Sequence, residues 1–222
     1  MKKQWCIPKV GPDFLWRMED VLDLYAEPFD PRRPWVCFDE KPYQLVGDKR
    51  EPIPVEPGRP QRIDYEYNRN GSCNLFLLLQ PQEGWRHLEV TGQRRAKDFA
   101  HQMKALVDEH FPEAEVVRVV LDNLNIHGGG ALYETFPPEE ARRIVRKLEF
   151  HYTPKHGSWL NMAEIELSVL SRQCLDRRIS DMPTLRTEVA EWETERNEHR
   201  ATINWRFTTK DARTKLSRLY IS

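Results

Sequence analysis

The sequence predicts an α/β protein built on a mixed sheet with helices on both faces. Two observations lead to this fold class. Residues 35–92 hold predicted strands without an intervening helix, and a short glycine-containing turn joins the last two, which favours antiparallel pairing. Beyond residue 95, strands and helices alternate, which is typical of parallel strands joined by crossover helices. With 222 residues, 39% of them hydrophobic, the chain is long enough for a substantial core in one domain with appendages.

The first elements differ in how deeply they should be buried. Residues 12–26 place apolar side chains at helical spacing, and the proline-containing stretch AEPFDPRRP then ends the helix and forms a stiff linker. WVCFDE (35–40) is expected to be a short buried strand that ends in two acids. The proline-rich residues 50–62 should form a long loop. RIDYEYNR (62–69) alternates like an exposed hairpin strand.

The most apolar segment, NLFLLLQP (74–81), is expected to be a central strand with WRHLEVTG (85–92) as its antiparallel partner. A helix should then run from residue 95 to 111, with Pro112 just past its end. EVVRVVLDN (115–123) is a second buried strand that ends in an acid.

The C-terminal half continues the alternation of strands and helices. HGGG (127–130) is expected to be a flexible loop that leads to a helix over 138–147. LEFHYTP (148–154) should form a further strand, and a helix develops within KHGSWLNMAEIELSVL (155–170). Helices over 183–199 and 209–219 complete the chain.

Composition and charge exclude some classes of protein. No apolar run is long enough to cross a bilayer, and the N-terminus lacks the apolar core of a secretory signal, so we expect a cytosolic protein without membrane contact. The four cysteines are scattered, which favours reduced and mostly buried thiols. The net charge of −1 gives no global sign of a polyanionic partner, but residues 200–222 hold six Lys and Arg against one acid.

Two glutamates in the segment 155–170 can be separated by helical geometry. Residues two apart on a helix point about 200° apart, so Glu164 and Glu166 cannot face one site. Glu164 falls on a narrow polar stripe with Asn161, Ser168 and Ser171, which makes it the better candidate for a metal ligand. The alternative is that Glu164 lies on a solvated helix face and Glu166 forms a structural ion pair.

Asp39 and Asp122 each follow a predicted buried strand. Side chains at the carboxyl ends of neighbouring strands converge on the ligand crevice of open α/β sheets, although a single acid there is often only a turn or cap residue. With Glu164 they would provide three carboxylates, which suit Mg²⁺. Two such ions can support hydrolysis or transfer of a phosphodiester.

Three segments together resemble the DDE transposases of the Tc/mariner superfamily, specifically the bacterial insertion-sequence branch: VCFDEKP (36–42), VVLDNLNIH (119–127) and HYTPKHGSWLNMAEIELSVL (151–170). The resemblance implies a ribonuclease H-like fold with a mixed five-stranded sheet, flanking helices and additional C-terminal helices. It implies Asp39, Asp122 and Glu164 as catalytic residues and as ligands of two Mg²⁺ ions, which Mn²⁺ can replace. The implied activity is cut-and-paste transposition by a homodimer on DNA.

This resemblance suggests three regions: an N-terminal helix and linker (1–34), the catalytic domain (35–180) and a C-terminal helical extension (181–222). Relatives carry helix-turn-helix modules before the catalytic domain, whereas about 34 residues precede the first strand here. We therefore expect the catalytic half of a transposase. Two alternatives stay open, namely an inert truncated transposase that acts as an assembly or inhibitory partner, and a general ribonuclease H-like nuclease.

Several other residues are candidates for supporting roles. His127 and His156 lie in loops beside the acids, where either could touch a scissile phosphate, while Asn123 and Asn161 could orient metal ligands or simply cap an element. A zinc site built from histidines and Cys174 matches no compact zinc spacing. The C-terminal cations, and those of residues 142–155, could contact DNA, or they could lie on solvated helix faces while the tail's aromatic residues pack on the domain.

Overall fold

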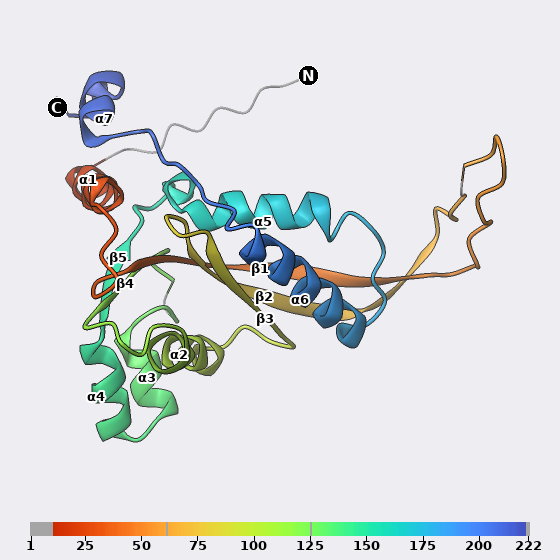
Figure 1. Ribbon diagram of the computed structural model, residues 1–222, viewed down its shortest axis with the longest axis horizontal. Coiled ribbons are helices and arrows are strands. Elements are labelled where there is room, and N and C mark those ends of the chain that lie inside the picture. Colours follow the sequence, from red (N-terminus) through yellow and green to blue (C-terminus); the bar gives the residue numbers. More distant parts are fainter. Residues whose placement is uncertain (1–10, 61, 125, 221–222) are drawn as a thin grey trace.

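The computed structural model describes residues 11–60, 62–124 and 126–220. Its centre is a five-stranded sheet of order β3-β2-β1-β4-β5 (Figure 1). The strands are β1 (Trp35–Asp48), β2 (Tyr67–Gln80), β3 (Trp85–Thr91), β4 (Val117–Leu121) and β5 (Leu148–Tyr152). β1, β2 and β3 pair antiparallel, whereas β4 runs parallel to both β1 and β5. The predicted mixed sheet is confirmed.

Helices cover both faces of this sheet, as predicted. One face carries α1 (Pro12–Ala26), α5 (Met162–Gln173) and α6 (Met182–Glu198), and the other carries α2 (Ala96–Ala105), α3 (Gly129–Thr135) and α4 (Pro138–Arg146). α2 continues as a π-helical turn over Leu106–His110, and α7 (Thr209–Lys215) lies beside α1.

Alternation along the strands divides the core in two. In β1, Cys37 packs toward α5 while Phe38 packs toward α2, and in β2 Leu77 and Leu78 divide in the same way. Successive side chains of a strand point to opposite faces, so each central strand is apolar on both sides. The alternation also fixes the direction of the polar residues that follow Phe38 in β1.

The first two strands are longer than predicted. β1 does not end after the acids of WVCFDE, because residues 41–48 continue it and pair with the first half of β2. The expected separate strand over residues 62–69 is also wrong, since its last residues, from Tyr67, are the start of β2. Beyond the helical layers this pair of strands projects as an arm, at the right of Figure 1. The arm was not predicted because its residues are mostly exposed and lack the apolar pattern of buried strands.

The glycine-rich segment HGGG is not simply a loop. Gly129 and Gly130 begin α3, which packs against α2 and α4. A Cβ on Gly129 would make only an ordinary contact with the Val145 side chain, at 3.6 Å, so the packing of α3 on α4 does not require glycine there. The helix predicted over 209–219 stops at Lys215 and is followed by a 3₁₀ turn over Ser217–Leu219.

Two expectations from composition can be compared with the fold. Cys37, Cys73 and Cys174 are buried free thiols, as expected, and Cys6 lies outside the described residues. Among the helices that the structure describes, none is long and apolar enough to cross a membrane.

Candidate active site

The register of the parallel strands brings two acids together. Cys37 of β1 lies opposite Val120 of β4, so Asp39 and Asp122 each come two residues beyond a paired position. Asp122 follows the last residue of β4, whereas Asp39 lies in the middle of β1. The expectation that Asp39 ends a strand is therefore wrong, but it does lie beyond the carboxyl end of the parallel pairing. Cys37 and Val120 both face α5, and alternation places Asp39 on that face too.

Helix α5 is fixed to β1 next to Asp39 by Asn161. The Asn161 side-chain amide donates to the carbonyl oxygen of Phe38 at 2.8 Å, and its Oδ1 accepts from the backbone N–H of Ala163 at 3.1 Å. The same residue thus caps the helix and ties it to the strand. Glu164, in the first turn, is exposed and lines a cavity of about 410 Å³ together with Asp39.

Asp39 is a carboxylate surrounded by other carboxylates. Burial raises the pKa of Asp39 to about 7; the backbone N–H of Glu40, 2.8 Å from Oδ1, acts in the opposite direction, and the negative charges of Glu40, Glu164 and Asp122 add to the rise. Asp39, Glu40 and Glu164 line one cavity, so their negative charges repel one another there. Such a group gains from any added cation that relieves the repulsion.

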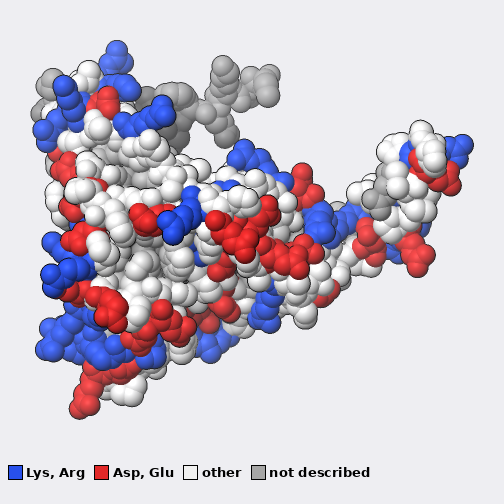
Figure 2. All heavy atoms as spheres, viewed as in Figure 1, with Lys and Arg blue, Asp and Glu red and all other residues white. Residues whose placement is uncertain are grey.

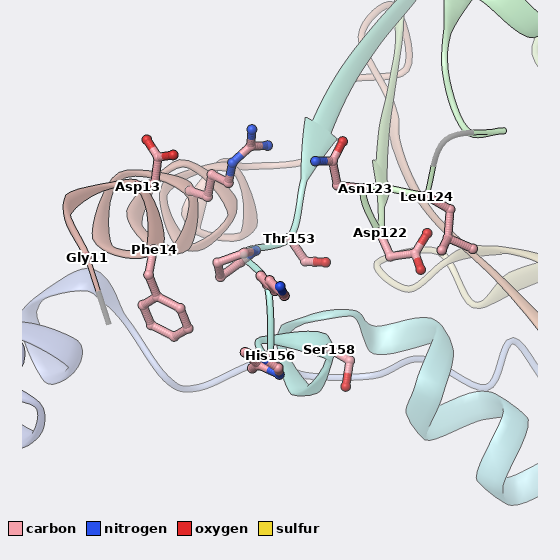
Figure 3. A pocket seen from close by; sticks show the side chains of 12 residues that line it. Gly11, Asp13, Phe14, Asp122, Asn123, Leu124, Thr153, His156 and Ser158 are labelled. Atoms are coloured by element: carbon pink, nitrogen blue, oxygen red, sulfur yellow. The ribbon is translucent and has the colours of Figure 1, made fainter. Parts of the chain in front are cut away.

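Asp122 lines a second cavity, of about 700 Å³ (Figure 3). Asn123 and His156, both exposed, line the same cavity, across from residues of α1. Oδ1 of Asp122 lies 2.5 Å from Nδ1 of His127. Asp122 is thus not gathered with Asp39 and Glu164 around one point, and in the described parts of the chain no three Asp, Glu, His or Cys side chains form a ready metal cluster.

His127 is buried between two acids. Its Nε2 lies 3.2 Å from Oε2 of Glu40, opposite the contact with Asp122. Burial alone would lower the pKa of His127, but hydrogen bonds and the negative charges of Asp122 and Glu40 raise it to about 9. Glu40 in turn accepts from Arg94 Nη1 at 2.8 Å. Neither Glu40 nor Arg94 was predicted to be a site residue. Strand alternation places Glu40 on the face opposite Asp39, and this is the signal that could have identified it.

Glu166 lies in a different environment from Glu164. Its side chain is fully buried, with Oε1 2.9 Å from Arg86 Nε and 2.6 Å from Arg196 Nε. Arg196 Nη2 also donates to Oε2 at 3.0 Å. These contacts tie α5 to β3 and α6. The alternative weighed for this helix, with Glu166 in a structural ion pair and Glu164 on an exposed face, therefore describes both side chains, although Glu164 also lines the cavity with Asp39.

The residues considered for zinc do not meet. His151 lies between Asp20 and Glu149, at 2.8 Å and 2.9 Å, where it links α1 to β5. Cys174 is buried in the core on the α5 face, whereas His156 is exposed at the large cavity. Their separation agrees with the absence of a zinc spacing in the sequence.

Some cations of the basic segments have partners within the chain. Trp205 packs against Tyr25 and stacks on Trp159, and Arg213 of α7 pairs with Glu19 of α1. These contacts support packing of the tail's aromatic residues on the domain. Figure 2 shows Lys and Arg beside α4 with acids interleaved, and Arg143 there pairs with Asp108 and Glu140.

The strand order, with helices on both faces, defines a ribonuclease H-like α/β domain. Residues 34–186, which are more than half of the chain, match the DDE superfamily endonuclease family. The protein therefore belongs to the DDE superfamily endonucleases. No curated protein sequence matches it.

Solved structures of the Mos1 mariner transposase share the fold. The chain is similar to the Mos1 mariner paired-end complex with Mn, with 18% identity, a TM-score of 0.58, and coverage of 99% of this chain and 64% of that chain. The paired-end complex with the left transposon end and the strand transfer complex give TM-scores of 0.57 and 0.56, each with 19% identity and coverage of 90% of this chain and 62% of that chain. The chain thus spans less than two thirds of the length of the Mos1 chains.

Proposed function

We propose that this protein is the catalytic domain of a cut-and-paste transposase of the insertion-sequence type, which cleaves DNA and transfers the freed strand. The observation that carries the proposal is the placement of the acids: Asp39 and Glu164 line one cavity, and Asp122 lies just past the end of β4, which runs parallel to the strand that holds Asp39. Membership in the DDE superfamily endonucleases supports the same chemistry.

In this proposal Asp39, Asp122 and Glu164 hold Mg²⁺, with Mn²⁺ able to replace it. Carboxylate oxygens are the donors that Mg²⁺ prefers, and repulsion around Asp39 favours a bound cation. Bound Mg²⁺ ions supply activation of the attacking oxygen and stabilisation of the leaving oxygen in phosphoryl transfer. The Mos1 structures solved with Mn and with Mg are consistent with this choice of metal.

DNA would reach the acids along the two cavities that flank them. Arg17, Lys155 and His156 line the cavity beside Asp122, and Lys41 and Arg172 line the cavity beside Asp39 and Glu164. Cations there would neutralise phosphates on either side of the scissile bond, so DNA affinity should fall with salt. We further propose that two copies act together on DNA, because the similar Mos1 structures are paired-end complexes.

The test is cleavage of a supercoiled plasmid in Mg²⁺. The wild-type chain should nick the plasmid, chelation by EDTA should stop the reaction, and Asp122→Asn should abolish nicking because one metal ligand loses its charge. The exposed Glu134→Gln on α3 serves as the matched charge-removal control and should act like the wild type.

Full activity in Asp122→Asn would contradict the proposal. An inactive wild type would favour the inert assembly partner, and equal cleavage of an RNA–DNA hybrid would favour a general ribonuclease H-like nuclease.

A further inference from the structure

The His127 side chain is buried between two acids, although the residue lies in a loop. Both ring nitrogens face carboxylates, Asp122 at 2.5 Å and Glu40 at 3.2 Å, and the side chain is 1% exposed. The rings of Phe38 and Phe99 enclose it, with centroids 5.3 Å and 5.0 Å away. The contact with Asp122 is a hydrogen bond, whereas Nε2 and the nearby Oε2 of Glu40 make no hydrogen bond of standard geometry.

The backbone of His127 is fixed as well. Its N–H donates to the carbonyl oxygen of Leu124 at 2.9 Å, and its own carbonyl oxygen accepts from the Tyr152 hydroxyl at 3.0 Å. Glu40 is just as constrained, because its side chain is 2% exposed and it accepts from Arg94 on the other side. The chain of contacts therefore runs from Arg94 through Glu40 and His127 to Asp122.

Asp122 needs such support more than Asp39 does. Asp39 lies within β1 and pairs with Leu77 of β2, so sheet hydrogen bonding fixes its backbone. Asp122 lies just past the end of β4, and its side chain is 39% exposed at the large cavity. Without a fixed partner, that carboxylate would be free to rotate toward solvent.

We infer that His127 and Glu40 are positioning residues, and that the Nδ1–H of His127 holds Oδ1 of Asp122 so that Oδ2 stays free to bind a divalent cation. Because a carboxylate oxygen accepts, the proton lies on Nδ1. Hydrogen-bonded partners behind a metal ligand usually set its orientation, and their loss typically lowers metal affinity or activity about 10- to 100-fold. This inference rests on the proposed function, since it takes Asp122 as a metal ligand.

Two substitutions of His127 distinguish the roles of its two ring nitrogens. In His127→Asn, the amide nitrogen can take the place of Nδ1 and donate to Asp122. In His127→Gln, the longer side chain carries its nitrogen toward Glu40 and leaves Asp122 without a donor. Glu134→Gln is the control, because it removes an exposed charge on α3 that contacts neither the ring nor its two acids.

The experiment is a Mn²⁺ titration without DNA, in which electron paramagnetic resonance measures the free ion, with plasmid nicking at several Mg²⁺ concentrations as a second readout. His127→Gln should weaken Mn²⁺ binding about 10- to 100-fold and raise the Mg²⁺ needed for half-maximal nicking by a similar factor. His127→Asn should stay within a few-fold of the wild type. Glu134→Gln should change neither the unfolding midpoint in urea nor the Mn²⁺ affinity.

Equal Mn²⁺ affinity in His127→Gln and the wild type would overturn the inference alone. Equal weakening in His127→Asn and His127→Gln would overturn it too, because the ring's bulk and not Nδ1 would then matter. If either variant fails to fold, Glu40→Gln decides: weaker Mn²⁺ binding supports the inference, and wild-type affinity overturns it. A wild type that binds no Mn²⁺ would overturn the proposed function and this inference together.

Discussion

Helix α5 carries two glutamates that occupy opposite kinds of environment. Glu166 is buried and its charge is matched by Arg86 and Arg196, which lie on β3 and α6. Glu164 is exposed and lines a cavity with Asp39, whose pKa is raised by burial and by other acids. The contrast teaches that a buried acid with matched cations holds the fold together, whereas acids gathered around an uncompensated carboxylate mark a place for an added cation.

The first prediction concerns Glu166, whose charge is balanced by two arginines. Glu166→Gln should lower the free energy of unfolding by about 3 to 5 kcal/mol, because it leaves the fully buried Arg86 without its counter-charge. Urea denaturation followed by tryptophan fluorescence measures this. A loss well below about 1 kcal/mol would mean that the ion pair contributes little to the fold.

The second prediction concerns Asp39, which lies among other acids. Here, removal of the charge should stabilise the fold, in contrast to Glu166. In metal-free protein at pH 8, Asp39→Asn should raise the free energy of unfolding by about 1 to 2 kcal/mol, because it removes a charge that is both partly desolvated and repelled by its neighbours. The same denaturation in EDTA checks it. Destabilisation would contradict the description of Asp39 as an uncompensated charge.

The third and smallest prediction uses a histidine that also lies between two acids but away from the cavities. Burial opposes protonation of His151, yet the hydrogen bonds that its ring donates to the carboxylates of Asp20 and Glu149, and the charges of these acids, raise its pKa above the usual value. This contribution to stability is complete below about pH 6.5 and is lost as the pH rises through the folded-state pKa. We expect it to be no more than about 1 kcal/mol, since Asp20 and Glu149 are partly exposed.

A comparison of His151→Gln with the wild type between pH 5.5 and 9 isolates that contribution. The difference in unfolding midpoint should be largest at the acidic end. A difference that grows toward alkaline pH would reverse the assigned sign.

The sequence predicted those parts of the molecule that short-range patterns control. Apolar runs located β4 and β5, and helical spacing separated Glu164 from Glu166 before any contact was known. The ribonuclease H-like fold and the endonuclease family are confirmed as well. The roles assigned to Asp39, Asp122 and Glu164 stay predictions, as do the three regions bounded at residues 34 and 180, the bacterial branch and the dimer.

Long-range pairing controls what the sequence could not give. Arg86 lies in a strand whose pattern resembles an ordinary partner strand, and it is buried only because α6, a hundred residues later, covers it. The extension of β1 past Asp39 depends on pairing with the first half of β2, whose residues are mostly polar and exposed. The contact between Glu40 and His127 joins residues from two separate segments, so neither segment alone predicts it.

The most direct test of the account compares the two glutamates in one assay. Glu164→Gln and Glu166→Gln make the same chemical change two residues apart on one helix, and plasmid nicking in Mg²⁺ is measured per mole of folded protein. We expect Glu164→Gln to lower the nicking rate at least about 100-fold while its fold stays intact. The nicking rate of Glu166→Gln, corrected for the fraction of folded protein, should stay within a few-fold of the wild type. Full nicking by Glu164→Gln, or an equal loss in both variants, would contradict the account.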